Sequence, residues 1–130
     1  MENALDQILD TLRDLARDAQ GVYDIVYNGA LPEQDSMVMA LTAGGEVNVG
    51  LDYYGDHNLD IVCNAKHADQ QTVIRALTAV HLTLSRMKTF PSGDGWRINS
   101  VSTSSMPRFL ERDSDQFLYG SGFSVLVTID

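Results

Sequence analysis

The feature that most constrains this fold is a repeated change in the hydrophobic period along the chain. Residues 3–20 and residues 69–88 place apolar side chains at three- and four-residue steps, which is typical of amphipathic helices. Five other segments alternate in polarity or run apolar over short stretches, and these predict strands at 22–29, 36–43, 58–66, 96–104 and 116–130. The order α-β-β-β-α-β-β indicates an α+β fold. We expect a mostly antiparallel five-stranded sheet with two helices packed on one face.

Turn and cap residues support several of these boundaries. Gly21 is expected to end the first helix, and Asp69 is expected to be the N-cap of the second. In the last strand, Gly120 and Gly122 predict a bend or a bulge.

Two connecting segments are harder to interpret. Residues 106–115 are polar and predict a long loop. Residues 46–57 admit two interpretations, because Val47, Val49 and Leu51 alternate as in a hairpin arm while the glycines suit a flexible loop.

Length and cysteine content limit the class of protein. The 130 residues have the size of one domain, 1–130. The single cysteine, Cys63, excludes an intrachain disulfide and a multi-cysteine zinc site, and it favours a reducing compartment. No apolar run approaches the roughly 18 residues of a membrane helix. The first residues are acidic where a signal peptide is basic, so we expect a soluble, unexported protein with no membrane partner.

The net charge of −9 argues against a protein that grips nucleic-acid phosphates, which requires a basic surface. The charge is also uneven. Residues 1–60 hold twelve acidic and two basic residues, net −10, whereas residues 61–130 hold six acidic and seven basic residues, net +1. Two surfaces of different charge are therefore expected on one molecule.

An acidic series follows the outer side of the first predicted helix. Arg13 and Arg17 offset part of its charge, each three residues after an aspartate. The series is either a solvated helix face or a surface lining a passage for a polyanion that must not bind. This candidate acidic surface consists of Asp6, Asp10, Asp14 and Asp18.

Residues with catalytic or metal-binding chemistry are few. His57, His67 and His81 fall in a loop, at a helix start and within a helix, without the spacing of a metal motif, and we interpret them as polar surface and helix-cap residues. Cys63 lies at one of the alternate apolar positions of its predicted strand, and we interpret it as a small core residue. We therefore expect no catalytic residues, no cofactor and no metal site.

Aromatic and apolar residues in predicted loops are more informative. Tyr53 and Tyr54 stand beside glycines, and Phe109 and Leu110 stand in an otherwise polar segment. Such residues are common anchors of protein interfaces, although they also fold back over cores. We take these four as the candidate assembly interface.

The pattern of the whole chain resembles the minor capsid proteins of tailed phages and prophages, which are similar in turn to the tail-terminator (tail-completion) proteins of long-tailed phages. The resemblance rests on the leading amphipathic helix and on a set of segments along the chain. These are 29–33 (GALPE), 51–55 (LDYYG), 59–66 (LDIVCNAK), 72–77 (TVIRAL), 106–110 (MPRFL) and the final aromatic-rich strand.

The resemblance implies a structural virion protein without catalysis. It implies a homo-oligomeric ring, with a hexamer expected, at the head-proximal end of the tail. The partners it implies are the tail tube protein and a head-completion or neck protein, with DNA only in passage. Such a protein would be assembled in the bacterial host cytoplasm and reside in the virion. A ring needs two different patches on each subunit, which the −10 and +1 halves could supply.

Two other classes compete with this interpretation. A monomeric ligand-binding or regulatory α+β domain would show an apolar pocket with convergent polar groups. A small enzyme would need His57, His67 or His81 to meet carboxylates in a cleft.

Overall fold

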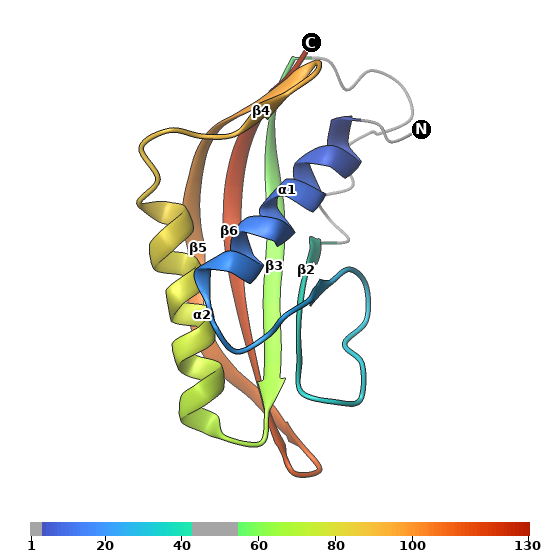
Figure 1. Ribbon diagram of the computed structural model, residues 1–130, viewed down its shortest axis with the longest axis vertical. Helices are drawn as coiled ribbons and strands as arrows, with labels where there is room; N and C mark the ends of the chain where they lie inside the picture. The colour runs from blue at the N-terminus through green and yellow to red at the C-terminus, as the bar shows by residue number, and fades with distance from the viewer. Residues whose placement is uncertain (1–3, 43–54) are drawn as a thin grey trace.

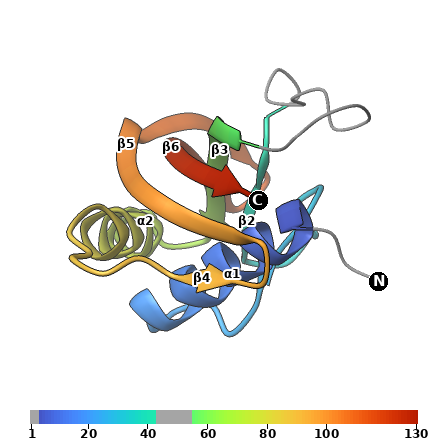
Figure 2. The ribbon, with the colours of Figure 1, turned by 90° about the horizontal axis from the view of Figure 1, so that it is seen from above.

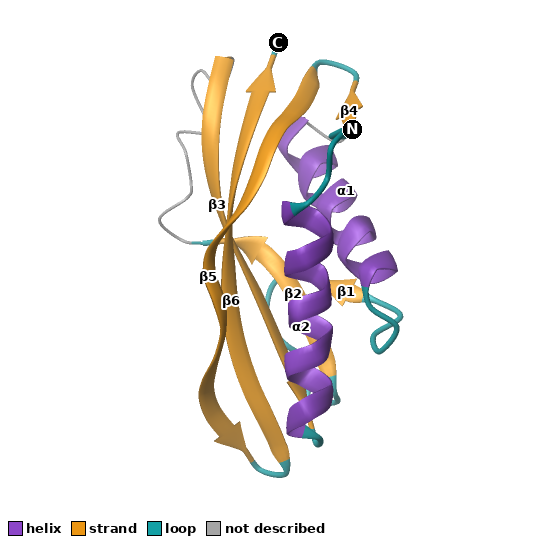
Figure 3. Cartoon of the chain, turned by 90° about the vertical axis from the view of Figure 1, so that its left-hand side faces the viewer, coloured by secondary structure: helices purple, strands orange, loops and turns teal. Residues whose placement is uncertain are grey.

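A computed structural model of the chain describes residues 4–42 and 55–130. It contains the two predicted helices, α1 (Ala4–Ala19) and α2 (Gln70–Ser85). Both lie on the same side of a curled sheet (Figures 1 and 3). The predicted α+β class and the packing of two helices on one face are therefore confirmed.

The sheet in the described part of the chain has six strands rather than five. They are β1 (Val26–Tyr27), β2 (Ser36–Leu41), β3 (Gly55–His67), β4 (Ser92–Gly93), β5 (Trp96–Asp113) and β6 (Gln116–Ile129). Their order across the sheet is β1-β2-β3-β6-β5-β4. All neighbours are antiparallel except β1 and β2, which are parallel. The prediction of a mostly antiparallel sheet holds, while the strand count was one short because the two-residue strand β4 leaves no periodic signal.

The strand predicted at 22–29 is reduced to β1. The cause is the buried side chain of Gln20, whose Oε1 accepts hydrogen bonds of 2.7 Å from the backbone N–H groups of Val22 and Tyr23. Its Nε2 donates to the carbonyl of Tyr23 at 2.7 Å. Backbone groups that would form a ladder are thus satisfied by a side chain, so the segment is a loop that ends α1.

The loop predicted at 106–115 is wrong, because β5 continues through this segment to Asp113. A two-residue turn, Ser114-Asp115, joins it to β6, and Ser114 has the positive φ of 55° that tight hairpin turns favour. The eighteen residues of β5 pair with only fourteen of β6, with four register shifts along the pair. Each bulge interrupts the alternation of side chains, which is why the sequence pattern concealed the strand.

Gly120 and Gly122 mark two of these bulges, but the extra residues lie in the opposite strand. The register of β6 with β3 is the same on both sides of the two glycines, whereas two of the four shifts in β5 lie opposite them. A Cβ at Gly122 would lie 2.8 Å from Ser104 Oγ, and one at Gly120 would lie 2.7 Å from Leu110 Cδ1. The missing side chains let the bulged strand approach β6 closely, and β5 curves past α2 towards α1 (Figure 2).

The hydrophobic core fills the space between the helices and the sheet. Ile8 and Leu12 of α1 and Leu77 and Val80 of α2 are fully buried, and Phe123 of β6 lies in the same cluster. Burying one such side chain contributes about 1.5–3 kcal/mol, so the two apolar helix stripes fix the layer arrangement. Within the described residues, neither helix has the length and apolar character needed to cross a membrane.

Candidate functional site

His81 corrects the prediction that the histidines belong to the surface. It is 1% exposed, and its ring stacks on Phe123 with 3.9 Å between ring centroids and 11° between the planes. Nδ1 lies 2.8 Å from Thr103 Oγ1, while the buried Nε2 contacts no hydrogen-bond partner among the described residues. Burial lowers the pKa of His81 to about 4, so the ring is neutral at pH 7. The burial of His81 was not predicted because histidine has intermediate polarity and was assigned to the surface. In the structure, α2 directs the ring towards the core.

The other two histidines lie in β3 rather than in a loop or at a helix start. His57 lies near the beginning of the strand and His67 is its last residue. The Nδ1 atom of His67 accepts a 2.9 Å hydrogen bond from the N–H of Asp69, and its Nε2 lies 3.4 Å from Asp35 Oδ2. Gln116 Nε2 also donates to Asp35 at 2.7 Å. These contacts tie the β1–β2 connector to β3 and to the β5–β6 hairpin.

Cys63 lies in the core, as its strand parity predicted. It is fully buried, and burial raises the pKa of its thiol to about 12. A thiol with this pKa stays protonated at pH 7 and is a poor nucleophile. Across residues 4–42 and 55–130, no three His, Cys, Asp or Glu side chains gather in a group that could hold a metal ion.

The candidate acidic surface follows the outer side of α1, as predicted. Its charge is partly compensated by Arg13, which pairs with Asp10 at 3.0 Å, and by Arg17, which lies 3.4 Å from both Asp14 and Asp18. Exposed pairs of this kind contribute little to stability, on the order of 0–1 kcal/mol. Asp6 is exposed in the first turn of the same helix.

The candidate assembly interface is only partly within the described residues. Tyr53 and Tyr54 lie outside them. Phe109 and Leu110 are 52% and 43% exposed, and Met106 beside them is 53% exposed. They belong to β5 instead of the predicted loop, so their backbone is paired with β6. We call Met106, Arg108, Phe109 and Leu110 the β5 arm.

Contacts with β6 hold the β5 arm in place. The ring of Phe109 meets Tyr119 edge to face at 5.7 Å, and Leu110 packs over Gly120. The Tyr119 hydroxyl in turn accepts a 2.6 Å hydrogen bond from Gln70 of α2. The side chain of Arg108 is exposed, and no ion pair or side-chain hydrogen bond joins it to another described residue. The arm therefore presents Arg108 and Leu110 on the helix-free face of the sheet and Phe109 on the face of Tyr119.

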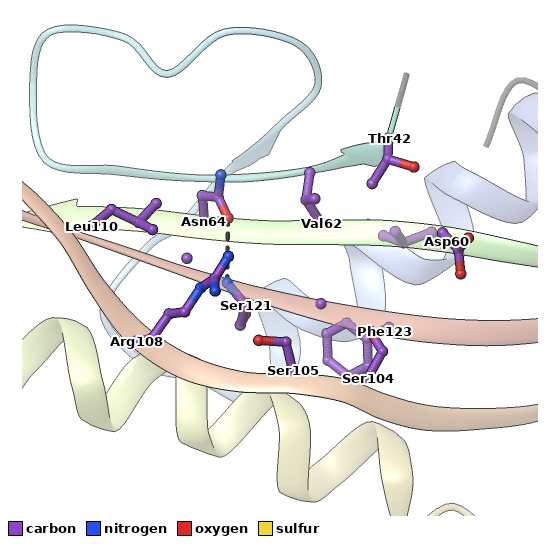
Figure 4. Close-up of a pocket in the computed structure, with 13 residues that line it drawn as sticks. Thr42, Asp60, Val62, Asn64, Ser104, Ser105, Arg108, Leu110, Ser121 and Phe123 are labelled. Carbon is purple, nitrogen blue, oxygen red and sulfur yellow. Dashed lines mark hydrogen bonds between the residues drawn. The ribbon is translucent and has the colours of Figure 1, made fainter. Parts of the chain in front are cut away.

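A groove of about 280 Å³ lies beside the arm on the helix-free face of the sheet (Figure 4). Arg108 extends over it towards Asn64, and Asp60 lies at its other end. Arg108 pairs in register with Gly120 and Asp60 with Ser124, a separation of about 13 Å along the strands. The lining residues include the hydroxyls of Ser104 and Ser105 but no histidine that could activate them.

A second hollow, of about 290 Å³, was not predicted from the sequence. It lies beside the loop that follows α1, and its exposed apolar residues are Val22 (41%) and Ile25 (57%). Asp24 and Asp35 supply negative charge, and the wall also includes Tyr27 and His67, whose Nε2 lies 3.4 Å from Asp35. We call Val22, Asp24, Ile25, Tyr27 and Asp35 the acidic hollow. The alternation in 22–29 predicted a strand, in which Val22 and Ile25 would point to opposite faces. In the loop that forms instead, both side chains are exposed.

Buried contacts fix the shape of the acidic hollow. Gln20 holds the loop as described above, and Tyr23 anchors it by donating from its hydroxyl to the carbonyl of Lys66 at 2.8 Å. Burial, and after it the nearby charge of Asp35, raises the pKa of Tyr23 above its ordinary value. The hydroxyl therefore stays a donor at neutral pH. Volumes of 280–290 Å³ lie at the lower limit of small-molecule pockets and suit single side chains better.

Comparison with known proteins adds no relative. No protein-family model matches the chain, and no curated protein matches it either.

Proposed function

We propose that this chain is a phage or prophage structural protein of the minor capsid or tail-terminator type. It assembles with copies of itself into a ring at the head-proximal end of the tail and joins tail to head. Its partners are the tail tube protein and a head-completion or neck protein, and DNA only passes through. The protein acts in the virion after assembly in the bacterial host cytoplasm, without catalysis or cofactor. The assignment of the chain to a phage or prophage assembly rests on the resemblance to minor capsid and tail-terminator proteins described above.

The observation that carries self-assembly is the β5 arm. Seven large apolar side chains are exposed in the described part of the chain, and Met106, Phe109 and Leu110 of the arm are three of them. Isolated exposed apolar residues need no explanation, but a group of three on one short stretch of strand is typical of an interface. Phe109 and Leu110 already contact β6, so little side-chain conformational entropy would be lost when they dock.

The net charge supports the passage of DNA through such a ring. A lumen lined by the outer side of α1 would repel phosphate, because Asp10, Asp14 and Asp18 outnumber the two arginines that they contact. Reversing these charges without loss of tail function would contradict this part of the proposal.

The experiment that tests self-assembly is native mass spectrometry across a concentration series, with electron microscopy of the largest species. We expect a discrete closed oligomer, a hexamer, and a loss of this species in the Phe109→Ser/Leu110→Ser variant. The matched control is Leu82→Ser, which removes an exposed apolar side chain from α2. A strict monomer at every concentration would contradict self-assembly and favour a monomeric ligand-binding or regulatory domain.

A further inference from the structure

The acidic hollow and the β5 arm have complementary chemistry. The arm combines exposed apolar side chains with the cation Arg108, and the hollow combines Val22 and Ile25 with the carboxylates of Asp24 and Asp35. Together the two surfaces hold five of the seven exposed large apolar side chains in the described residues. Asp24 is exposed, and its side chain, like that of Arg108, makes no hydrogen bond or ion pair within the described part of the chain. Asp35 already contacts His67 and Gln116, so Asp24 is the carboxylate of the hollow that is open to a cation from outside.

The topology keeps the two surfaces apart within one subunit. The hollow lies at β1, at one end of the strand order, and the arm lies on β5 near the other end. Four strand spacings, about 19 Å along the sheet, separate β1 from β5. Figure 3 places the loop after α1 on the helix side of the molecule and the far half of β5 on the opposite side. A subunit cannot fill its own hollow with its own arm, but a neighbouring copy can.

We propose that the β5 arm of one copy docks into the acidic hollow of the next copy. Arg108 pairs with Asp24, while Leu110, which lines the same face of the sheet as Arg108, lies against Val22 and Ile25. Because the two surfaces differ, the contact is head-to-tail, and repetition of it produces a ring when the rotation closes. This inference rests on the proposed self-assembly and names the surfaces that form its interface.

The occupant of the hollow follows from charge and size. A hollow of about 290 Å³ with one aromatic wall and two carboxylates accepts an apolar side chain accompanied by a cation. On the arm, the side chains of Arg108 and Leu110 share the helix-free face and both line the groove, whereas the Phe109 ring lies on the other face against Tyr119. The second copy of this chain thus supplies both groups in a rigid arrangement.

The test is a charge exchange between Arg108 and Asp24. Alone, Arg108→Asp or Asp24→Arg should raise the concentration for half-assembly about tenfold or more, because like charges then meet at the contact. An equimolar mixture of the two variants should reassemble, since the arm of each then fits the hollow of the other. Native mass spectrometry should find both subunits in equal numbers in the restored oligomer. The double variant Arg108→Asp/Asp24→Arg should assemble alone.

Matched controls separate this pairing from general charge effects. Arg97→Asp changes another exposed arginine of β5, and Asp94→Arg changes another exposed aspartate, in a turn away from the hollow. Both should assemble like the wild type. All four substitutions are at exposed positions, so thermal unfolding of each subunit should be unchanged.

The outcomes distinguish the inference from the proposed function. If the wild type forms oligomers and both single variants assemble normally, the proposed docking is wrong, whereas self-assembly is still supported. Loss of assembly in both single variants without recovery in the mixture would show that the two surfaces do not face each other. A wild-type protein that never assembles would overturn both proposals.

Discussion

His81 offers the sharpest test of the core, because its burial predicts a specific dependence of stability on pH. The ring lies between α2 and β6, stacked on Phe123, with Nδ1 at Thr103 and Nε2 without a partner among the described residues. Protonation of the folded protein would place a charge in this apolar site. For that reason burial lowers the pKa of His81 to about 4, against an ordinary value near 6.5.

The sign of the effect follows from which state binds the proton first. As the pH falls, the unfolded chain protonates near 6.5, while the folded chain resists until about 4. The contribution of His81 to the free energy of unfolding is therefore most favourable above pH 6.5 and declines as the pH falls towards 4. A difference of about 2.5 pKa units at 1.36 kcal/mol each gives a total loss of about 3 kcal/mol. About 2 kcal/mol of this is lost by pH 5.

The assay compares urea unfolding of the wild type and of His81→Phe from pH 4 to pH 7.5. Phenylalanine keeps a flat ring against Phe123 but cannot titrate. The difference between the two unfolding free energies should shift by about 3 kcal/mol in favour of the variant as the pH falls. Titrating carboxylates are common to both proteins, so their contributions cancel.

Thr103→Val is the control, because it removes the hydroxyl that contacts the histidine but keeps the titrating ring. It should lower stability by about 1 kcal/mol at pH 7 and retain a steep pH dependence. Parallel curves for the wild type and His81→Phe would refute the reasoning, since they would mean that the ring is not protected from protonation in the folded protein.

Three further substitutions or reactions test other parts of the fold. Gln20→Ala leaves several backbone groups after α1 unpaired, so urea unfolding should show a free energy of unfolding lower by about 1–3 kcal/mol. The exposed control Gln71→Ala should change this free energy by less than about 0.5 kcal/mol. Equal effects of the two substitutions would contradict the role of Gln20. Gly122→Ala brings a methyl group to 2.8 Å from Ser104 Oγ and should cost about 1–3 kcal/mol in a thermal melt. Adding Ser104→Ala should restore most of that loss, and no restoration would argue against the close approach of β5. The Cys63 thiol, fully buried with a pKa raised to about 12, should react with a thiol reagent only in denaturant; rapid labelling of the native protein would contradict its position.

The helices and the last strand were predictable because their apolar residues follow one period without interruption. Leu5, Ile8, Leu12 and Leu15 alone define the face that α1 turns to the sheet. The same holds for α2 and for the alternation from Phe117 to Ile129 in β6. In these elements local periodicity and tertiary burial agree, so the sequence was sufficient.

The far half of β5 shows why periodicity fails at bulges. The segment 106–113 has no alternation because register shifts on both sides of Arg108 reset which face each side chain takes. Its partner strand β6, however, continues through to Gln116 and satisfies its backbone. The identity of Phe109 and Leu110 as exposed apolar residues was predictable, but their placement on a rigid strand was not.

By itself, the sequence determined the α+β class, the two helix faces, the burial of Cys63 and the excess of negative charge on the first half of the chain. Each of these depends on residue type and spacing within one element. Only the tertiary structure decided that His81 enters the core, that Gln20 turns a strand-like segment into a loop, and that the acidic hollow and the β5 arm lie on opposite sides of one sheet. These features depend on contacts between residues far apart in the chain, such as His81 with Thr103 and Tyr23 with Lys66, and no local pattern encodes such contacts.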